Sequence, residues 1–160
     1  MDAAVLLAAC TVLAGCGYAL RADRGPQGVR TVAIDVVANN TYRQRVEVPL
    51  TREIYRTLPT HMGITPASKD TADAVLTVEI EQIQGLSLVQ GGADPVREGA
   101  LQWHVHVVLT DRRTGEVLVD QRIVDRSEFR TPVGENTDTA VRESAMDLGR
   151  KIALALEPGF

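Results

Sequence analysis

Hydrophobic and polar residues alternate over several stretches of this 160-residue chain, which is the two-residue period of a β-strand with one buried face. The clearest stretch is 101–110, where the odd-numbered residues are apolar and most even-numbered residues are polar. Similar alternation covers 31–36 and 74–84. The residues expected on the buried faces of these two strands are Val32, Ile34 and Val36, and Leu76, Val78 and Ile80.

A hairpin turn is expected directly after the 101–110 strand. The segment Asp111-Arg112-Arg113-Thr114-Gly115 is polar and ends in glycine, as tight turns between strands commonly do. The next strand is expected from Glu116 to about Phe129. These two strands should therefore pair antiparallel.

Two other stretches repeat apolar residues every three or four positions, the spacing of an amphipathic helix. The first runs from about Arg45 to Leu58, and Pro59 and Gly63 are expected to end it. Its apolar stripe consists of Val46, Leu50, Ile54, Tyr55 and Leu58. The second helix is expected over 137–157, with a stripe of Val141, Ala145, Leu148, Ile152 and Ala155.

The order strand, helix, three or four strands, helix predicts a two-layer α+β fold. In this fold, two helices pack on one face of a mostly antiparallel sheet of four to five strands, and the opposite sheet face stays polar. Gln102, His104 and His106 lie on that polar face, which suits water or the polar lining of a larger partner. Its other expected members are Thr31, Asp35, Thr77, Glu79, Asp120 and Arg122.

The first sixteen residues have the pattern of a bacterial lipoprotein signal. No charged residue occurs between Ala3 and Ala14, and this run is shorter than the roughly 20 apolar residues of a membrane-spanning helix. The run ends in Leu13-Ala14-Gly15-Cys16, a lipobox, so Cys16 is expected to carry lipid at the mature N-terminus. Cys10 closes a second, poorer lipobox. The predicted organisation is a signal peptide at 1–15, a lipidated tether at 16–28 and one domain at 29–160.

Charge and composition exclude nucleic-acid binding as the expected function. The formal net charge is −4, and the basic residues are spread along the chain instead of forming one cationic stretch. Fifteen of the 17 basic residues are arginines, whose planar guanidinium groups suit bidentate contacts with anions. Arg112 and Arg113 at the hairpin tip could bind an anion, and they could equally keep an exposed turn soluble.

The sequence carries no recognisable catalytic set, so the chain is not expected to be an enzyme. His104 and His106 lie two apart on one strand and could both reach a metal ion, but no third ligand is evident, and two solvent-side imidazoles explain them as well. Ser127 and Ser144 have no histidine nearby in sequence to act as a base. No metal and no cofactor are expected, apart from the covalent lipid on Cys16.

Several segments together resemble the lipopolysaccharide-assembly lipoprotein family LptE. They are the start Cys16-Gly17-Tyr18 and the stretches "VRTVAIDVVANNTY", "LTREIYRTL", "ADAVLTVEI" and "LQWHVHVVLTDRRTGEVLVDQRIV". The likeness extends over nearly the whole chain after Cys16, and the order and spacing of the segments carry it.

This resemblance implies a non-catalytic outer-membrane lipoprotein that faces the periplasm. It would plug and help to assemble the large β-barrel LptD, bind lipopolysaccharide and assist its transport to the surface of a Gram-negative cell. The absence of Asp after Cys16 agrees with the outer membrane as the destination. Arg112 and Arg113 are the candidate lipopolysaccharide contacts, because guanidinium groups suit lipid A phosphates. An alternative is a lipoprotein adaptor that regulates another envelope enzyme, such as a cell-wall synthase.

Overall fold

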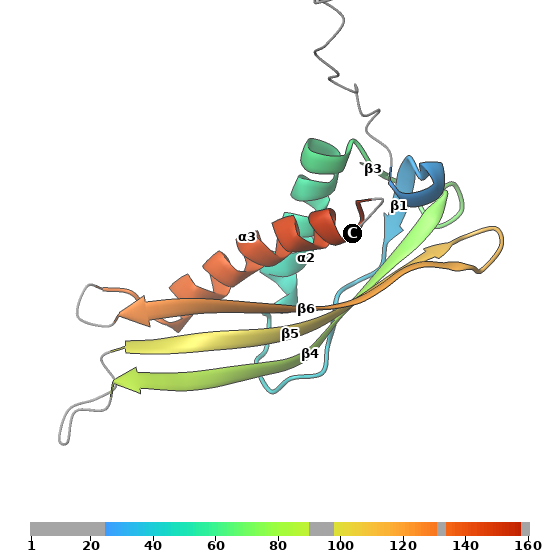
Figure 1. The fold of residues 1–160 in the computed structure, drawn as a ribbon. Coiled ribbons are helices and arrows are strands. Elements are labelled where there is room, and N and C mark those ends of the chain that lie inside the picture. Colours follow the sequence, from blue (N-terminus) through green and yellow to red (C-terminus); the bar gives the residue numbers. More distant parts are fainter. Residues whose placement is uncertain (1–24, 90–97, 131–133, 158–160) are drawn as a thin grey trace, which may run out of the picture.

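The computed structural model describes residues 25–89, 98–130 and 134–157 (Figure 1). Two helices lie on one face of a sheet whose three long strands extend beneath them (Figure 1). The predicted signal peptide and the lipidation residue Cys16 lie outside the described residues, as does most of the predicted tether. Of that tether, Gly25–Gly28 is described, and Gly25 and Pro26 are buried against the domain.

The sheet is mixed. In chain order the elements are η1 (Pro26–Gly28), β1 (Thr31–Ile34), β2 (Ala38–Asn39), α2 (Glu47–Thr57), η2 (Leu58–Met62), β3 (Thr65–Pro66), β4 (Ala74–Val89), β5 (Glu98–Asp111), β6 (Val117–Arg130) and α3 (Thr137–Ala155). The strand order is β3-β1-β4-β5-β6, with β2 paired to β4. The α+β prediction is confirmed, but the sheet has six strands instead of four or five. Pairings within β4–β5–β6 are antiparallel, whereas β1, β2 and β3 pair in parallel.

The core forms between the helices and the inner face of the sheet. The five odd-numbered side chains from Leu101 to Leu109 are at most 1% exposed, as the alternation predicted, and Leu76, Val78 and Ile80 of β4 are fully buried beside them. They pack against the helix residues Leu50, Ile54, Leu148 and Ile152 in one cluster. Burial of each such side chain contributes about 1.5–3 kcal/mol, so this layer of side chains holds the two-layer arrangement together.

The prediction for the first strand is wrong at Val36, whose side chain is 77% exposed. The strand β1 ends at Ile34, and the N–H of Asp35 donates to the carbonyl of Leu76 at 3.0 Å. The chain pairs with β4 again at Ala38, opposite Glu79, so it holds one extra residue between the two pairings. This break shifts the alternation by one position, so Val37 is buried instead. Ala33 is also buried, which shows that β1 is covered on both faces.

The first helix, α2, is followed directly by a π-helical turn, η2. The chain continues from α2 into η2, a π-helical turn that contains Pro59, and ends at Gly63 with φ of 63°. Pro59 lies in the first turn of η2, where a backbone N–H has no partner within the turn, so its missing donor costs η2 no hydrogen bond. The α-helix ends at Thr57, just before Pro59, and the π-helical turn that follows ends at Gly63, as these two residues predicted. Tyr55, expected on the buried stripe, is 45% exposed.

Candidate functional site

The outer sheet face is the side of β4, β5 and β6 that points away from the helices. Gln102, His104 and His106 all lie on this face, because they alternate with the buried residues of β5. The register places His106 between Glu79 of β4 and Arg122 of β6. It places Gln102 between Gln84 and Arg126 in the same way. The structure therefore assembles a continuous polar surface over three strands, and its contact with a partner stays a prediction.

Hydrogen bonds and ion pairs link the side chains of this face. His106 Nε2 lies 2.7 Å from Asp120 Oδ1, and Gln102 Nε2 lies 3.0 Å from His104 Nε2. The ion pairs are Arg122–Glu81 at 3.1 Å and Arg126–Glu128 at 3.0 Å. Both pairs are exposed, so each contributes little to stability. Such a face stays hydrated and carries charges of both signs, which an aqueous partner surface could match.

A cleft of about 520 Å³ opens where the loop after β2 meets the outer sheet face. Asn39 fixes the loop: its amide donates to the carbonyl of Arg43 at 2.7 Å and to Glu47 at 2.9 Å, and its Oδ1 accepts from the N–H of Thr41 at 3.0 Å. The loop is therefore preorganised. The cleft is lined by Asn40, Thr41, Tyr42, Arg43, Glu81, Gln82, Ile83 and His104.

The hairpin tip gives its two arginines different environments. The Asp111 carboxylate accepts hydrogen bonds from the N–H of Thr114 at 2.7 Å and from the N–H of Arg113 at 2.9 Å, and these bonds hold the pKa of Asp111 below its usual value. Arg112 is tied to the rest of the domain, because its Nε donates to the carbonyl of Ala72 at 2.6 Å. The guanidinium of Arg113 makes no hydrogen bond to any residue that the structure describes, and it is exposed. Arg113 is therefore free to reorient its whole guanidinium toward an anion, whereas Arg112 can offer only its terminal Nη groups while it keeps this bond.

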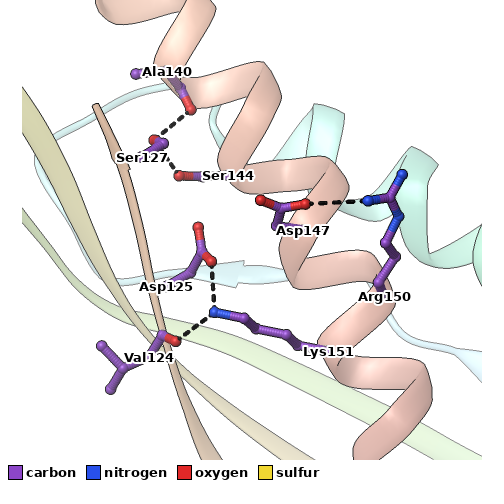
Figure 2. Close-up of polar contacts among 8 residues, drawn as sticks. All are labelled: Val124, Asp125, Ser127, Ala140, Ser144, Asp147, Arg150 and Lys151. Atoms are coloured by element: carbon purple, nitrogen blue, oxygen red, sulfur yellow. Dashed lines mark hydrogen bonds and ion pairs between the residues drawn. The ribbon is translucent and has the colours of Figure 1, made fainter. Parts of the chain in front are cut away.

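A buried polar cluster between β6 and α3 was missed by the sequence analysis (Figure 2). Lys151 Nζ lies 2.8 Å from Asp125 Oδ1 and donates to the carbonyl of Val124 at 3.1 Å. Ser127 Oγ donates to the carbonyl of Ala140 at 2.8 Å and lies 2.6 Å from Ser144 Oγ. The alternation along β6 could have revealed this cluster, because Asp125 and Ser127 occupy odd-numbered positions, whose side chains point inward. The two serines therefore join the helix to the sheet.

Within residues 25–89, 98–130 and 134–157, no three side chains of His, Cys, Asp or Glu are grouped so as to hold a metal ion. His104 and His106 therefore acquire no third ligand from that part of the chain. No helix in these same ranges has the length and apolar character needed to cross a membrane.

No model of a protein family matches this chain, and no curated protein matches its sequence. Several solved structures do match its fold. Lipoprotein B from Nitrosomonas europaea is 16% identical over 86% of this chain and 88% of its own, with a TM-score of 0.56. Rare lipoprotein B from Shewanella oneidensis is 16% identical over 78% of this chain and 92% of its own, with a TM-score of 0.51. PelC from Paraburkholderia phytofirmans, a dodecamer, is 19% identical over 83% of this chain and 93% of its own, with a TM-score of 0.56.

These likenesses show the fold, and it is a fold that bacterial lipoproteins have. Each extends over more than three quarters of both chains, so the likeness concerns most of the chain and not one short motif. Identities below 20% do not transfer the role of any single residue. What the outer sheet face can bind has to be argued from this chain's own side chains.

Proposed function

We propose that this chain is a non-catalytic outer-membrane lipoprotein, anchored by lipid on Cys16, that plugs and helps to assemble the β-barrel LptD and assists lipopolysaccharide transport. Three observations support the proposal: the lipobox at Cys16, the sequence resemblance to the LptE family, and the fold shared with rare lipoprotein B. The outer sheet face carries the argument furthest, because it is the part of the domain that would meet the barrel.

A plug has to present polar side chains to the polar interior of a large barrel while its own core stays dry. The outer sheet face meets this need over three strands, with His106–Asp120 and Arg122–Glu81 on its surface and an apolar layer directly behind it. Exposed ion pairs exchange partners at little cost. Carboxylates and guanidinium groups on this face can therefore pair with barrel side chains without unfolding the domain.

Copurification tests the proposal. A tagged full-length chain, solubilised from membranes in mild detergent, is expected to bring down LptD. The variant His104→Ala/His106→Ala should fold and be lipidated but retain less barrel, whereas Thr60→Ala, on the helix side, is the matched control. Recovery of no large barrel protein contradicts the proposal. Recovery of a cell-wall synthase in its place supports the adaptor alternative.

A further inference from the structure

The strand β6 forms one end of the sheet, so one of its long sides has no strand neighbour among the residues that the structure describes (Figure 1). A strand edge offers a row of backbone donors and acceptors that another chain can use. Native edges are commonly blocked by bulges, charges or covering segments. On β6, part of the edge is blocked in this way and part of it is open.

Three contacts show which backbone groups point out of the edge. The carbonyl of Val124 accepts from Lys151 Nζ at 3.1 Å. The N–H of Arg130 donates to Glu135 Oε2 at 2.8 Å, and its carbonyl accepts from the N–H of Glu135 at 3.2 Å. Backbone groups of a strand alternate in direction, and the register with β5 is unbroken from Val119 to Arg130. The even-numbered residues therefore direct their N–H and C=O outward.

The open part of the edge lies beside a groove. Residues 121–124 of β6 and the side chains of Lys151, Leu154 and Ala155 of α3 line a groove of about 350 Å³. Leu154 is 51% exposed and Val124 is 49% exposed. In this part of the edge, the outward backbone groups of Asp120 and Arg122 make no hydrogen bond to any described residue. Glu135 closes the edge at Arg130, and Lys151 occupies one acceptor at Val124.

We propose that the segment Asp120–Val124 is a docking edge that accepts an extended strand from a protein partner, by strand addition to the sheet. The partner strand would alternate apolar and acidic residues. Its apolar side chains would enter the groove beside Leu154, and its acidic side chains would lie on the outer face next to Arg122. The inference rests on the backbone and the groove, and it does not depend on the barrel proposed above.

Charge favours an acidic strand over a basic one. Arg122 lies on the outer side of the docking edge, and the carboxylate two positions away on that side, Asp120, is paired with His106 at 2.7 Å. The ammonium of Lys151 lies at the end of the edge and is paired with Asp125. The side chain of Arg122 is 67% exposed, so its pairing with Glu81 is solvent-screened and can be exchanged for a partner carboxylate. Glutamate opposite Arg122 therefore forms a cross-strand ion pair, whereas lysine there meets a like charge.

The probe is a short blocked peptide in which valine and glutamate alternate, added to the isotopically labelled chain. Amide exchange followed by NMR reports the result. Binding along the docking edge should slow exchange of the outward amides of Arg122 and Val124. The amides of Gln121 and Ile123 already face β5 and should not change. The same peptide with lysine in place of glutamate is expected to bind more weakly.

Paired variants separate docking from folding. Arg122→Pro removes an outward N–H without touching the ladder to β5, and it should weaken peptide binding roughly tenfold, the loss of about one hydrogen bond. Arg122→Gln removes the charge but keeps that donor, which separates the two contributions. Glu128→Pro removes an outward N–H beyond the groove and should leave binding unchanged. Leu154→Glu should abolish binding, whereas Leu88→Glu, at another exposed leucine, which lies on β4, should not.

Two results overturn the proposal. The first is a peptide that leaves exchange at Arg122 and Val124 unchanged at saturating concentration, or that binds Arg122→Pro as well as the parent chain. The second is protection of these amides without peptide as the protein concentration rises, which would identify a second copy of this chain as the occupant.

Discussion

Lys151 of α3 places its Nζ 2.8 Å from Oδ1 of Asp125 on β6, a residue that is only 4% exposed (Figure 2). The second carboxylate oxygen of Asp125 has no hydrogen-bond partner among the residues that the structure describes, and neither has the buried Nε1 of Trp103, which the register places directly opposite on β5. The carboxylate therefore depends on Lys151 for its charge partner. Together with the bond between Ser127 and Ser144, this pair fixes where α3 lies along β6.

Lys151→Met should destabilise the domain, because it leaves the Asp125 carboxylate buried without its cation. Removing one partner of a buried pair costs about 3–5 kcal/mol, and the partial exposure of Lys151 lowers our expectation to about 2 kcal/mol of unfolding free energy. Urea denaturation measures the change. Arg150→Met is the control, because Arg150 pairs with Asp147 at 3.5 Å on the surface and should lose less than about 0.5 kcal/mol. Equal losses in the two variants would refute the assigned role of Lys151.

Gly99 is required for the close approach of the Phe129 ring across the β5–β6 ladder. A Cβ atom at Gly99 would lie 2.5 Å from Phe129 Cζ, so Gly99→Ala has to displace the ring. We expect a loss of about 1 kcal/mol in thermal or urea unfolding. Gly85→Ala is the matched control in β4, where the nearest side-chain atom is Arg43 Nη2 at 3.9 Å. That variant should be neutral or slightly stabilising, since alanine restricts the unfolded chain. The expectation fails if both alanines behave alike.

The sequence predicted the long strands because their buried faces are almost purely apolar. From Leu101 to Leu109 every odd-numbered residue is apolar and every even-numbered residue except Val108 is polar, and such a pattern allows only one register of burial. Which residues after Ile34 are buried could not be predicted in this way, because the end of β1 at Asp35 depends on a bond to Leu76, 41 positions away. Tertiary pairing there overrides local alternation.

The candidate site was predicted only in part. Gln102, His104 and His106 followed from the same alternation, whereas the loop that forms the cleft next to His104 is positioned by bonds from Asn39 that no spacing reveals. The different hydrogen bonding of Arg112 and Arg113 could not be predicted from the sequence either. It arises because Arg112 reaches the carbonyl of Ala72, a contact between segments 40 positions apart.

Asp73 makes stability depend on pH in the acid range. Its Oδ2 accepts from the N–H of Arg30 at 3.0 Å, from the N–H of Thr31 at 2.9 Å and from Thr31 Oγ1 at 2.8 Å. These bonds hold the pKa of Asp73 below its usual value, and the bond from Arg30 has the largest effect. A carboxyl group whose pKa falls on folding stabilises the folded state above its unfolded pKa. That contribution is lost as the pH falls through the lowered folded value.

Asp73→Asn should therefore lower stability by about 1 kcal/mol near neutral pH and by progressively less below about pH 4. Urea titrations of both proteins over this range measure the difference. Asp70→Asn, at an exposed aspartate three positions earlier, is the control that removes a carboxylate and leaves the bonds of Asp73 in place. A gap between parent and Asp73→Asn that widens toward acid would contradict the argument.

The two hairpin arginines should respond differently to charge reversal if the chain binds lipopolysaccharide as proposed. Arg113→Glu should weaken binding of purified lipopolysaccharide and leave thermal unfolding unchanged, because its guanidinium is exposed and contacts no described hydrogen-bond acceptor. Arg112→Glu should also lower stability by about 1 kcal/mol, since it removes the bond to the carbonyl of Ala72. Arg113→Gln separates loss of the cation from introduction of a negative charge. Unchanged affinity in Arg113→Glu would rule out the hairpin tip as a lipid A contact, and the cleft beside His104 would become the next surface to test.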